Sequence, residues 1–260
     1  MASTNPARGM RDFLPADVRN REYVIGVIKS VYESYGFAPL ASDDASFGKK
    51  IEEGDKSVEA NSILAANEAL DGLGIKNFAI YFSHSDVLAC ILETVGVAEK
   101  LHRHTFAAIR DFSKFNIEGF VNELQDAGVS EKASVILADL FLKTDEILNQ
   151  EHDINRTVVS NLLNIVNSET LTELGQIVQL TGRKPVFIDP SLACESPYSP
   201  GIVIEARTSG LDVLGSGGCI EEDSNVFAFS FDIENIVALM ENSNAIPPAR
   251  DVSDSAAVLQ

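Results

Sequence analysis

A long helical stretch between two strand-rich segments constrains this chain more than any other feature of its sequence. In residues 99–180, apolar side chains recur at the three- and four-residue spacing of amphipathic helices. Residues 78–82 alternate like a strand before it, and residues 185–189 and 201–206 are rich in β-branched side chains after it. Elements segregated along the chain in this way predict an α+β fold, with an antiparallel sheet flanked by helices and an all-helical insertion.

The sequence outside this stretch predicts further helices. Residues 15–35, 58–73 and 233–240 have helical apolar spacing, and Ser85 or Asp86 is expected to cap a helix after the strand. The apolar stripe of the first helix is the expected interface of a homodimer. It consists of Val24, Val27, Ile28, Val31 and Tyr35.

The order of these patterns predicts the domain organisation. A chain of 260 residues is long enough for one large domain with an insert. We expect a core formed by residues 1–104 and 183–245, a helical insertion at 105–182, and a linker-like tail at 246–260.

The charge of the chain disfavours nucleic acid as a partner. The chain has 39 acidic and 20 basic residues, a net charge of -19, and the basic residues are dispersed. Such a surface repels phosphate backbones. The acidic run at 221–223 is expected to be a solvated loop and not a cation site.

The cysteines and the lack of long apolar runs indicate the kind of cellular compartment in which we expect the chain. Cys90, Cys194 and Cys219 are an odd number without metal-ligand spacing, which favours free thiols in a reducing compartment such as the cytoplasm. Apolar runs such as residues 135–142 are too short to span a bilayer, and the N-terminus has no secretory signal pattern. No membrane association is expected.

Two motifs that suggest ligands have simpler interpretations. The glycine-rich run at 215–218 lacks the spacing of phosphate-binding loops and is expected to be a turn. His102 and His104 point to different sides of a helix, so they and the remaining histidines, His84 and His152, are expected to be solvated. No metal or cofactor is expected.

Seven short segments, in the same order along the chain, carry a resemblance that no single one of them would establish. They are RGMRDFLP at 8–15, YESYGFAPL at 32–40, GKKIEEGDK at 48–56, FSH at 82–84, DPSLA at 189–193, GIVIE at 201–205 and AFSFDIE at 228–234. Together they resemble the class II histidyl-tRNA synthetases, from the dimer-forming motif 1, through both flanks of the histidine-specific signature, to motif 3. The resemblance implies a class II synthetase-like fold.

The departures from this family fall at positions that its chemistry needs. By the resemblance, arginines stand where this chain has Cys194, Cys219 and Asn235, and a tyrosine pair stands at Tyr198 and Ser199. Adenylate formation develops charge on a phosphoryl group, which arginines or Mg²⁺ must stabilise. Cysteine and asparagine provide neither the charge nor the paired donors of a guanidinium. The resemblance therefore implies a protein that does not activate histidine.

Two larger differences affect the architecture. The family carries a long stretch that includes motif 2, whose strands grip ATP, and this stretch is absent between Lys56 and Ser57. The proline that marks motif 1 is Asp43 here, which adds a charge beside the expected dimer seam. The chain also stops where the family's anticodon-binding domain would begin.

A remnant of the synthetase pocket is the expected site. Its residues are Cys194, Glu195, Tyr198, Ser199, Glu205, Cys219 and Asn235. Cys194 and Cys219 would form a reactive pair if the fold joined them, but no nearby base is evident, and inert thiols are expected.

These expectations favour a catalytically inactive histidyl-tRNA synthetase-like protein, acting as a dimeric scaffold or as a regulatory subunit of an unidentified protein partner. The regulatory subunit of ATP phosphoribosyltransferase is a precedent, because it resembles the same core and likewise lacks the anticodon-binding domain. One alternative is an enzyme with new chemistry, or small-molecule binding, in the remodelled pocket. A second alternative is a tRNA-binding pseudo-synthetase.

Overall fold

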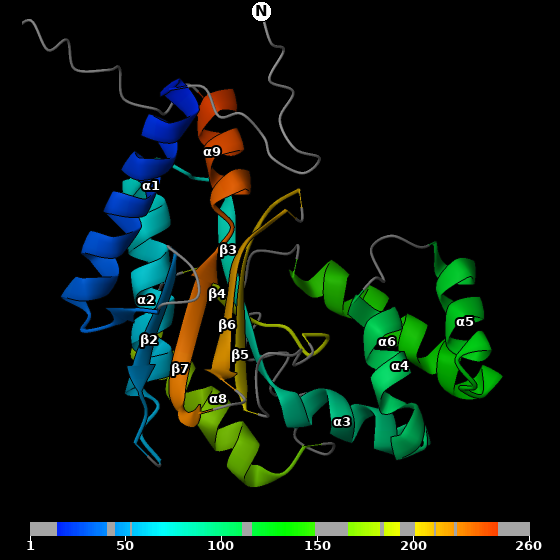
Figure 1. Cartoon of the computed structure of the whole chain (residues 1–260). Helices are drawn as coiled ribbons and strands as arrows, with labels where there is room; N and C mark the ends of the chain where they lie inside the picture. Colours follow the sequence, from blue (N-terminus) through cyan, green and yellow to red (C-terminus); the bar gives the residue numbers. More distant parts are fainter. Residues whose placement is uncertain are drawn as a thin grey trace, which may run out of the picture.

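The strand-like segments of the sequence come together in one sheet (Figure 1). The computed structural model describes residues 15–40, 45–52, 54–110, 116–148, 166–182, 185–192, 201–210, 212–220 and 223–243. The strands in these residues are β1 (Ala38–Pro39), β2 (Ser46–Lys50), β3 (Phe78–His84), β4 (Val186–Ile188), β5 (Ile202–Thr208), β6 (Val213–Ile220) and β7 (Asp223–Phe231).

The order of the strands is β1-β2-β7-β6-β5-β3-β4. All neighbouring strands are antiparallel except β3 and β4, which are parallel. A parallel pair needs a crossover connection, and the helical stretch between β3 and β4 supplies it. The α+β fold with a helical insertion is confirmed, with the difference that the sheet is mixed and not wholly antiparallel.

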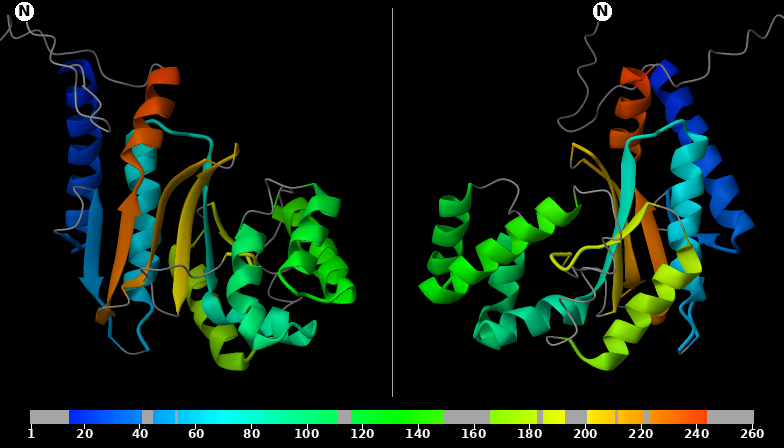
Figure 2. Two further views of the ribbon diagram at one scale, coloured as in Figure 1. Left: turned by 45° about the vertical axis from the view of Figure 1, so that its right-hand side comes forward. Right: turned by 180° about the vertical axis from the view of Figure 1, so that it is seen from behind.

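Helices lie on both sides of the sheet. The helices in the described residues are α1 (Pro15–Ser34), α2 (Ser57–Gly72), α3 (Ser85–Thr94), α4 (Glu99–Arg110), α5 (Ile117–Asp126), α6 (Glu131–Leu148), α8 (Ser168–Thr181) and α9 (Ile233–Asn242). Figures 1 and 2 show α1 and α2 along one side of the sheet, and α4, α5 and α6 as a lobe on the other side. The helix α3 leads from β3 into this lobe. None of the helices in the described residues is long and apolar enough to cross a membrane.

The last helix before β4 packs with the sheet and with α2. The helix α8 contacts α2, β3 and β4, and its Leu174 and Ile177 are 0% exposed in the main core. An insertion at 105–182 would include α8. We propose instead that the inserted lobe ends before α8 and that this helix belongs to the core.

Strand alternation gives the sheet one apolar and one polar face. A row of side chains across the apolar face is at most 1% exposed, and it consists of Phe47, Phe229, Ile204, Phe82 and Ile188. Their neighbours along the strands point to the opposite face and form a polar row, which consists of Ser46, Ser230, Ser216, Glu205 and Tyr81. The polar face is therefore where the fold offers groups for binding.

The glycine run at 215–218 lies inside strand β6 and does not form a turn. A Cβ on Gly215 would lie 2.6 Å from the ring of Phe229, and a Cβ on Gly217 would lie 2.6 Å from the backbone oxygen of Ala228. Glycine is required because β6 packs so closely on β7. The expectation of a turn was wrong because glycine serves turns and close backbone approaches alike.

The apolar stripe of α1 points largely into the protein itself. Val24 and Ile28 are 0% exposed within the single chain, so they are not part of a surface between two copies, contrary to expectation. Val27, Val31 and Tyr35 are partly buried against the same core. The stripe packs between α1 and the sheet, because burying large apolar side chains away from water stabilises the fold.

Candidate functional site

Three of the seven expected pocket residues lie in the described part of the chain, and the structure does not bring them together. Glu205 on β5 lies on the polar face, paired in register with Ser216. Cys219 on β6 is 7% exposed and belongs to the apolar core, so it faces away from Glu205. Asn235 lies at the start of α9. Outside the described residues lie Cys194, Glu195, Tyr198 and Ser199.

Asn235 attaches α9 to the start of β6. Its side-chain Nδ2 donates hydrogen bonds to the backbone oxygen of Val213 at 2.9 Å and to Oδ2 of Asp232 at 3.2 Å. Its backbone N–H donates to Oδ1 of Asp232, the N-cap of α9, at 3.0 Å. Both amide hydrogens therefore have partners within the protein, and the side chain positions α9 against β6.

An ion cluster occupies the polar face beside Glu205. Arg207 donates through one terminal nitrogen to Oδ2 of Asp189 at 3.0 Å and through Nε to Glu205, and its guanidinium carbon lies 5.0 Å from the ring centre of Tyr81. The Asp189 side chain is 1% exposed and that of Arg207 is 19% exposed. Burial alone would lower the pKa of Arg207, but the two carboxylates raise it overall, so the group stays charged.

The sequence did not lead us to predict this ion cluster, although the spacing of two of its residues indicates that they share a face of the sheet. Glu205 and Arg207 are two residues apart in a strand, which places them on the same face. Asp189 directly follows β4, and no local pattern connects it with Arg207. In β5, β6 and β7, all of whose residues are described, Arg207 is the only basic residue, and two carboxylates neutralise it.

A pocket opens where β6 begins and β7 ends, between α1 and α9. Its volume is about 410 Å³, and its polar lining consists of Arg21, Ser216, Ser230, Asp232 and Glu234. Arg21 forms an ion pair with Glu234. Because carboxylates outnumber the guanidinium, the lining disfavours a polyphosphate and suits an uncharged or cationic ligand.

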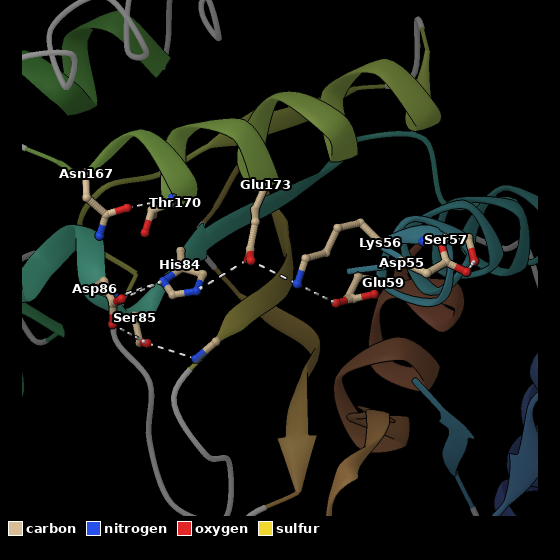
Figure 3. A network of polar contacts seen from close by, with 11 residues as sticks. Asp55, Lys56, Ser57, Glu59, His84, Ser85, Asp86, Asn167, Thr170 and Glu173 are labelled. Atoms are coloured by element: carbon tan, nitrogen blue, oxygen red, sulfur yellow. Dashed lines mark hydrogen bonds and ion pairs between the residues drawn. The ribbon is translucent and has the colours of Figure 1, made fainter. Parts of the chain in front are cut away.

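A second polar cluster joins α2, α3 and α8 at the root of the helical lobe (Figure 3). His84, at the end of β3, is the N-cap of α3, and its Nδ1 accepts a hydrogen bond of 3.1 Å from the backbone N–H of Asp86. Its Nε2 lies 3.6 Å from Oε2 of Glu173, which lies 3.0 Å from Nζ of Lys56. Lys56 also lies 3.4 Å from Oε1 of Glu59.

Burial controls the charges of this second cluster. Burial lowers the pKa of His84, an effect that the charges of Asp86 and Glu173 oppose. Burial alone would lower the pKa of Lys56, but its hydrogen bond to Glu173 and the charges of both carboxylates raise it overall. Burial raises the pKa of Glu59, whose Oε2 has no hydrogen-bond partner among the described residues.

The histidines differ from the expectation that all are solvated. His84 caps α3, a role expected of Ser85 or Asp86, because a neutral imidazole nitrogen accepts a hydrogen bond as a hydroxyl or carboxylate does. His102 is 8% exposed, and its Nε2 lies 3.2 Å from the backbone oxygen of Val97. No group of side chains in the described residues is arranged to hold a metal ion.

Comparison with known proteins places these features in context. No family model matches the chain. The histidine–tRNA ligase of Leifsonia xyli is 21% identical over 352 aligned positions, covering 94% of this chain and 81% of that protein. The ligase of Flavobacterium johnsoniae is 41% identical over 56 residues, 20% of this chain and 12% of that protein. An ATP phosphoribosyltransferase regulatory subunit of Streptococcus thermophilus is 25% identical over 163 residues, 60% of this chain and 46% of that protein.

Solved structures share the fold. Histidyl-tRNA synthetase from Nostoc superposes with a TM-score of 0.73 at 15% identity, over 95% of this chain and 77% of that one. An ATP phosphoribosyltransferase regulatory subunit/histidyl-tRNA synthetase from Bacillus halodurans gives 0.66 at 14% identity, over 98% and 96%. The sheet with its flanking helices and inserted lobe thus has a class II aminoacyl-tRNA synthetase-like fold. Within that class the chain is histidyl-tRNA synthetase-like, similar to both synthetases and regulatory subunits.

Proposed function

We propose that this chain is a catalytically inactive, histidyl-tRNA synthetase-like regulatory subunit that acts by binding a protein partner. The observation that carries this proposal is the neutralised state of Arg207, which Asp189 and Glu205 hold on the polar face. Adenylate formation needs cations or Mg²⁺ placed at the phosphoryl group. By the resemblance, the related synthetases have arginines at positions 219 and 235. Here Cys219 faces the core and Asn235 holds α9 in place.

Histidine-dependent ATP–pyrophosphate exchange tests the inactivity. We expect the native chain to stay at the background rate, with an active histidyl-tRNA synthetase as the positive control. The single variant Asn235→Arg should also stay at background, because one guanidinium does not replace the missing ATP-gripping strands. Exchange clearly above background by the native chain would refute this part of the proposal.

The partner is inferred from the relatives. The Streptococcus thermophilus relative is a regulatory subunit of ATP phosphoribosyltransferase, and we infer that the partner here is a catalytic chain of that kind, in a reducing compartment such as the cytoplasm. Co-expression with the phosphoribosyltransferase chain of the same organism should give a joint peak in gel filtration and a changed transferase rate. Separate elution with an unchanged rate would refute the partner and leave the inactivity untouched.

A second candidate function, small-molecule binding, is favoured by the pocket of about 410 Å³ between α1 and α9. A volume of this size suits a small metabolite. Its carboxylates, Asp232 and Glu234, predict that amines raise the melting temperature and that ATP does not. Stabilisation by ATP alone would argue against this assignment.

A further inference from the structure

The lobe formed by α4, α5 and α6 is joined to the sheet through a polar joint, which we define as His84, Asp86, Glu173 and Lys56. The chain enters the helical stretch at His84, the N-cap of α3. It returns through α8, which carries Glu173 and whose own N-cap is Asn167. Figure 3 shows the imidazole of His84 between the carboxylates of Asp86 and Glu173, with Lys56 on the far side of Glu173.

The hydrogen bonds fix where the proton of the neutral imidazole lies. Because Nδ1 of His84 accepts from the backbone N–H of Asp86 at 3.1 Å, it carries no hydrogen of its own. The proton of the neutral ring is therefore on Nε2, the nitrogen that faces the Glu173 carboxylate at 3.6 Å. In this state the imidazole serves α3 as an acceptor.

A second proton reverses that role. A protonated Nδ1 donates and no longer accepts, so the N-cap bond to the Asp86 N–H is lost. The carboxylate of Asp86 lies 3.7 Å from Nδ1 and becomes the natural acceptor. The contact from Nε2 to Glu173 becomes a charge-assisted one, in competition with Lys56 at 3.0 Å from the same carboxylate oxygen. The joint therefore has two different bonding arrangements, selected by one proton.

We propose that His84 is a proton-operated latch at the root of the helical lobe. In its neutral form it caps α3 and fixes the lobe against the sheet. In its protonated form it releases the cap, pairs with Asp86 and Glu173, and lets the lobe change its angle. The charged groups that face it are Asp86 of α3, Glu169 and Glu173 of α8, and Lys56, the N-cap residue of α2. The proposal does not depend on the proposed function.

The latch also reaches the sheet through the next residue. The backbone N–H of Ser85 donates to the oxygen of Gly201 at 2.9 Å, and the N–H of Gly201 donates to Oγ of Ser85 at 2.9 Å. Gly201 precedes β5 and directly follows residues 193–200, where four of the expected pocket residues lie. A shift in the first turn of α3 therefore acts on the lobe and on the start of β5 together.

Hydrogen exchange of the native chain tests the latch. Peptides that cover the first turn of α3 are compared at about pH 5 and about pH 7.5, on either side of the ordinary histidine pKa, after correction for intrinsic exchange. We expect protection at the lower pH to fall by about fivefold, the factor that corresponds to loss of an N-cap. Small-angle scattering should show a matching change in shape.

Two variants separate the latch from a merely structural cap. His84→Asn keeps an acceptor suited to an N-cap but cannot be protonated, so it should fold, as circular dichroism would show, and lose the pH response. His104→Asn, at an exposed position on α4, should keep it. No response in the native chain, or an equal response in His84→Asn, would overturn the proposal. Loss of protection without a change in scattering would overturn the movement of the lobe.

Discussion

The side-chain amide of Asn235 donates a hydrogen bond of 2.9 Å to the backbone oxygen of Val213 and so attaches α9 to β6. By the resemblance to histidyl-tRNA synthetases, an arginine stands at this position in motif 3. In this chain the side-chain amide of Asn235 is bound to the protein's own backbone and joins a helix to a strand.

Asn235→Ala should lower the free energy of unfolding by about 1 kcal/mol, because it removes the bond to Val213 and leaves a backbone acceptor without its partner. Urea denaturation followed by circular dichroism measures the change. Asn122→Ala, at an exposed position on α5, is the matched control and should change stability by less than about 0.5 kcal/mol. Equal effects of the two variants would contradict the structural role of Asn235.

Arg207→Met should destabilise the protein by about 3 kcal/mol, because it leaves the buried carboxylate of Asp189 without its ion partner. The double variant Asp189→Asn with Arg207→Met should recover part of this loss, and a double-mutant cycle from urea denaturation gives the coupling. The control is Lys76→Met, which breaks an exposed 3.4 Å pair with Asp71 and should cost less than about 1 kcal/mol. Additive effects of the two buried substitutions would contradict the ion cluster.

The stability should depend on pH through His84. Burial lowers its pKa in the folded chain, so below the ordinary value of about 6.5 the unfolded chain binds more protons than the folded one. The free energy of unfolding should therefore rise with pH through the window that ends near this value, and fall as the pH drops. His84→Asn should remove this slope in urea titrations at several pH values. An identical slope in both proteins would show that other groups cause it.

A homodimer, if it forms through α1, should use the outward residues of that helix. Val18 and Tyr23 are 41% and 38% exposed, whereas Val27 packs towards Gly72 of α2. Static light scattering should give twice the 28.1 kDa of one chain for the native protein and about 28.1 kDa for Tyr23→Asp. Val135→Asp, on the exposed side of α6, should leave the dimer intact. A native mass of 28.1 kDa would exclude the dimer.

Binding of tRNA should be absent at physiological ionic strength, because a net charge of -19 opposes the approach of phosphates. Fluorescence polarisation with labelled tRNA at about 150 mM salt is the measurement. Micromolar or tighter binding under these conditions would revive the pseudo-synthetase alternative.

The elements themselves were largely predictable, because their signals are local. The helix expected at 15–35 is α1 (Pro15–Ser34), the one at 58–73 is α2 (Ser57–Gly72), and the strand at 78–82 is part of β3 (Phe78–His84). The spacing of apolar residues that marks a helix or strand repeats within a few residues, so it can be recognised in the sequence. The pairing of one strand with another leaves no such local pattern, so the strand that contains the glycine run was mistaken for a turn.

The sequence by itself determined the fold class and the helical insertion between the strands. Only the tertiary structure decided which charges meet. Asp189 follows β4 and Arg207 lies in β5, and Lys56, His84 and Glu173 come from three segments far apart in the chain. Hydrogen bonds and ion pairs depend on distances of a few ångströms, and those distances are set by packing between elements and not by spacing along the sequence.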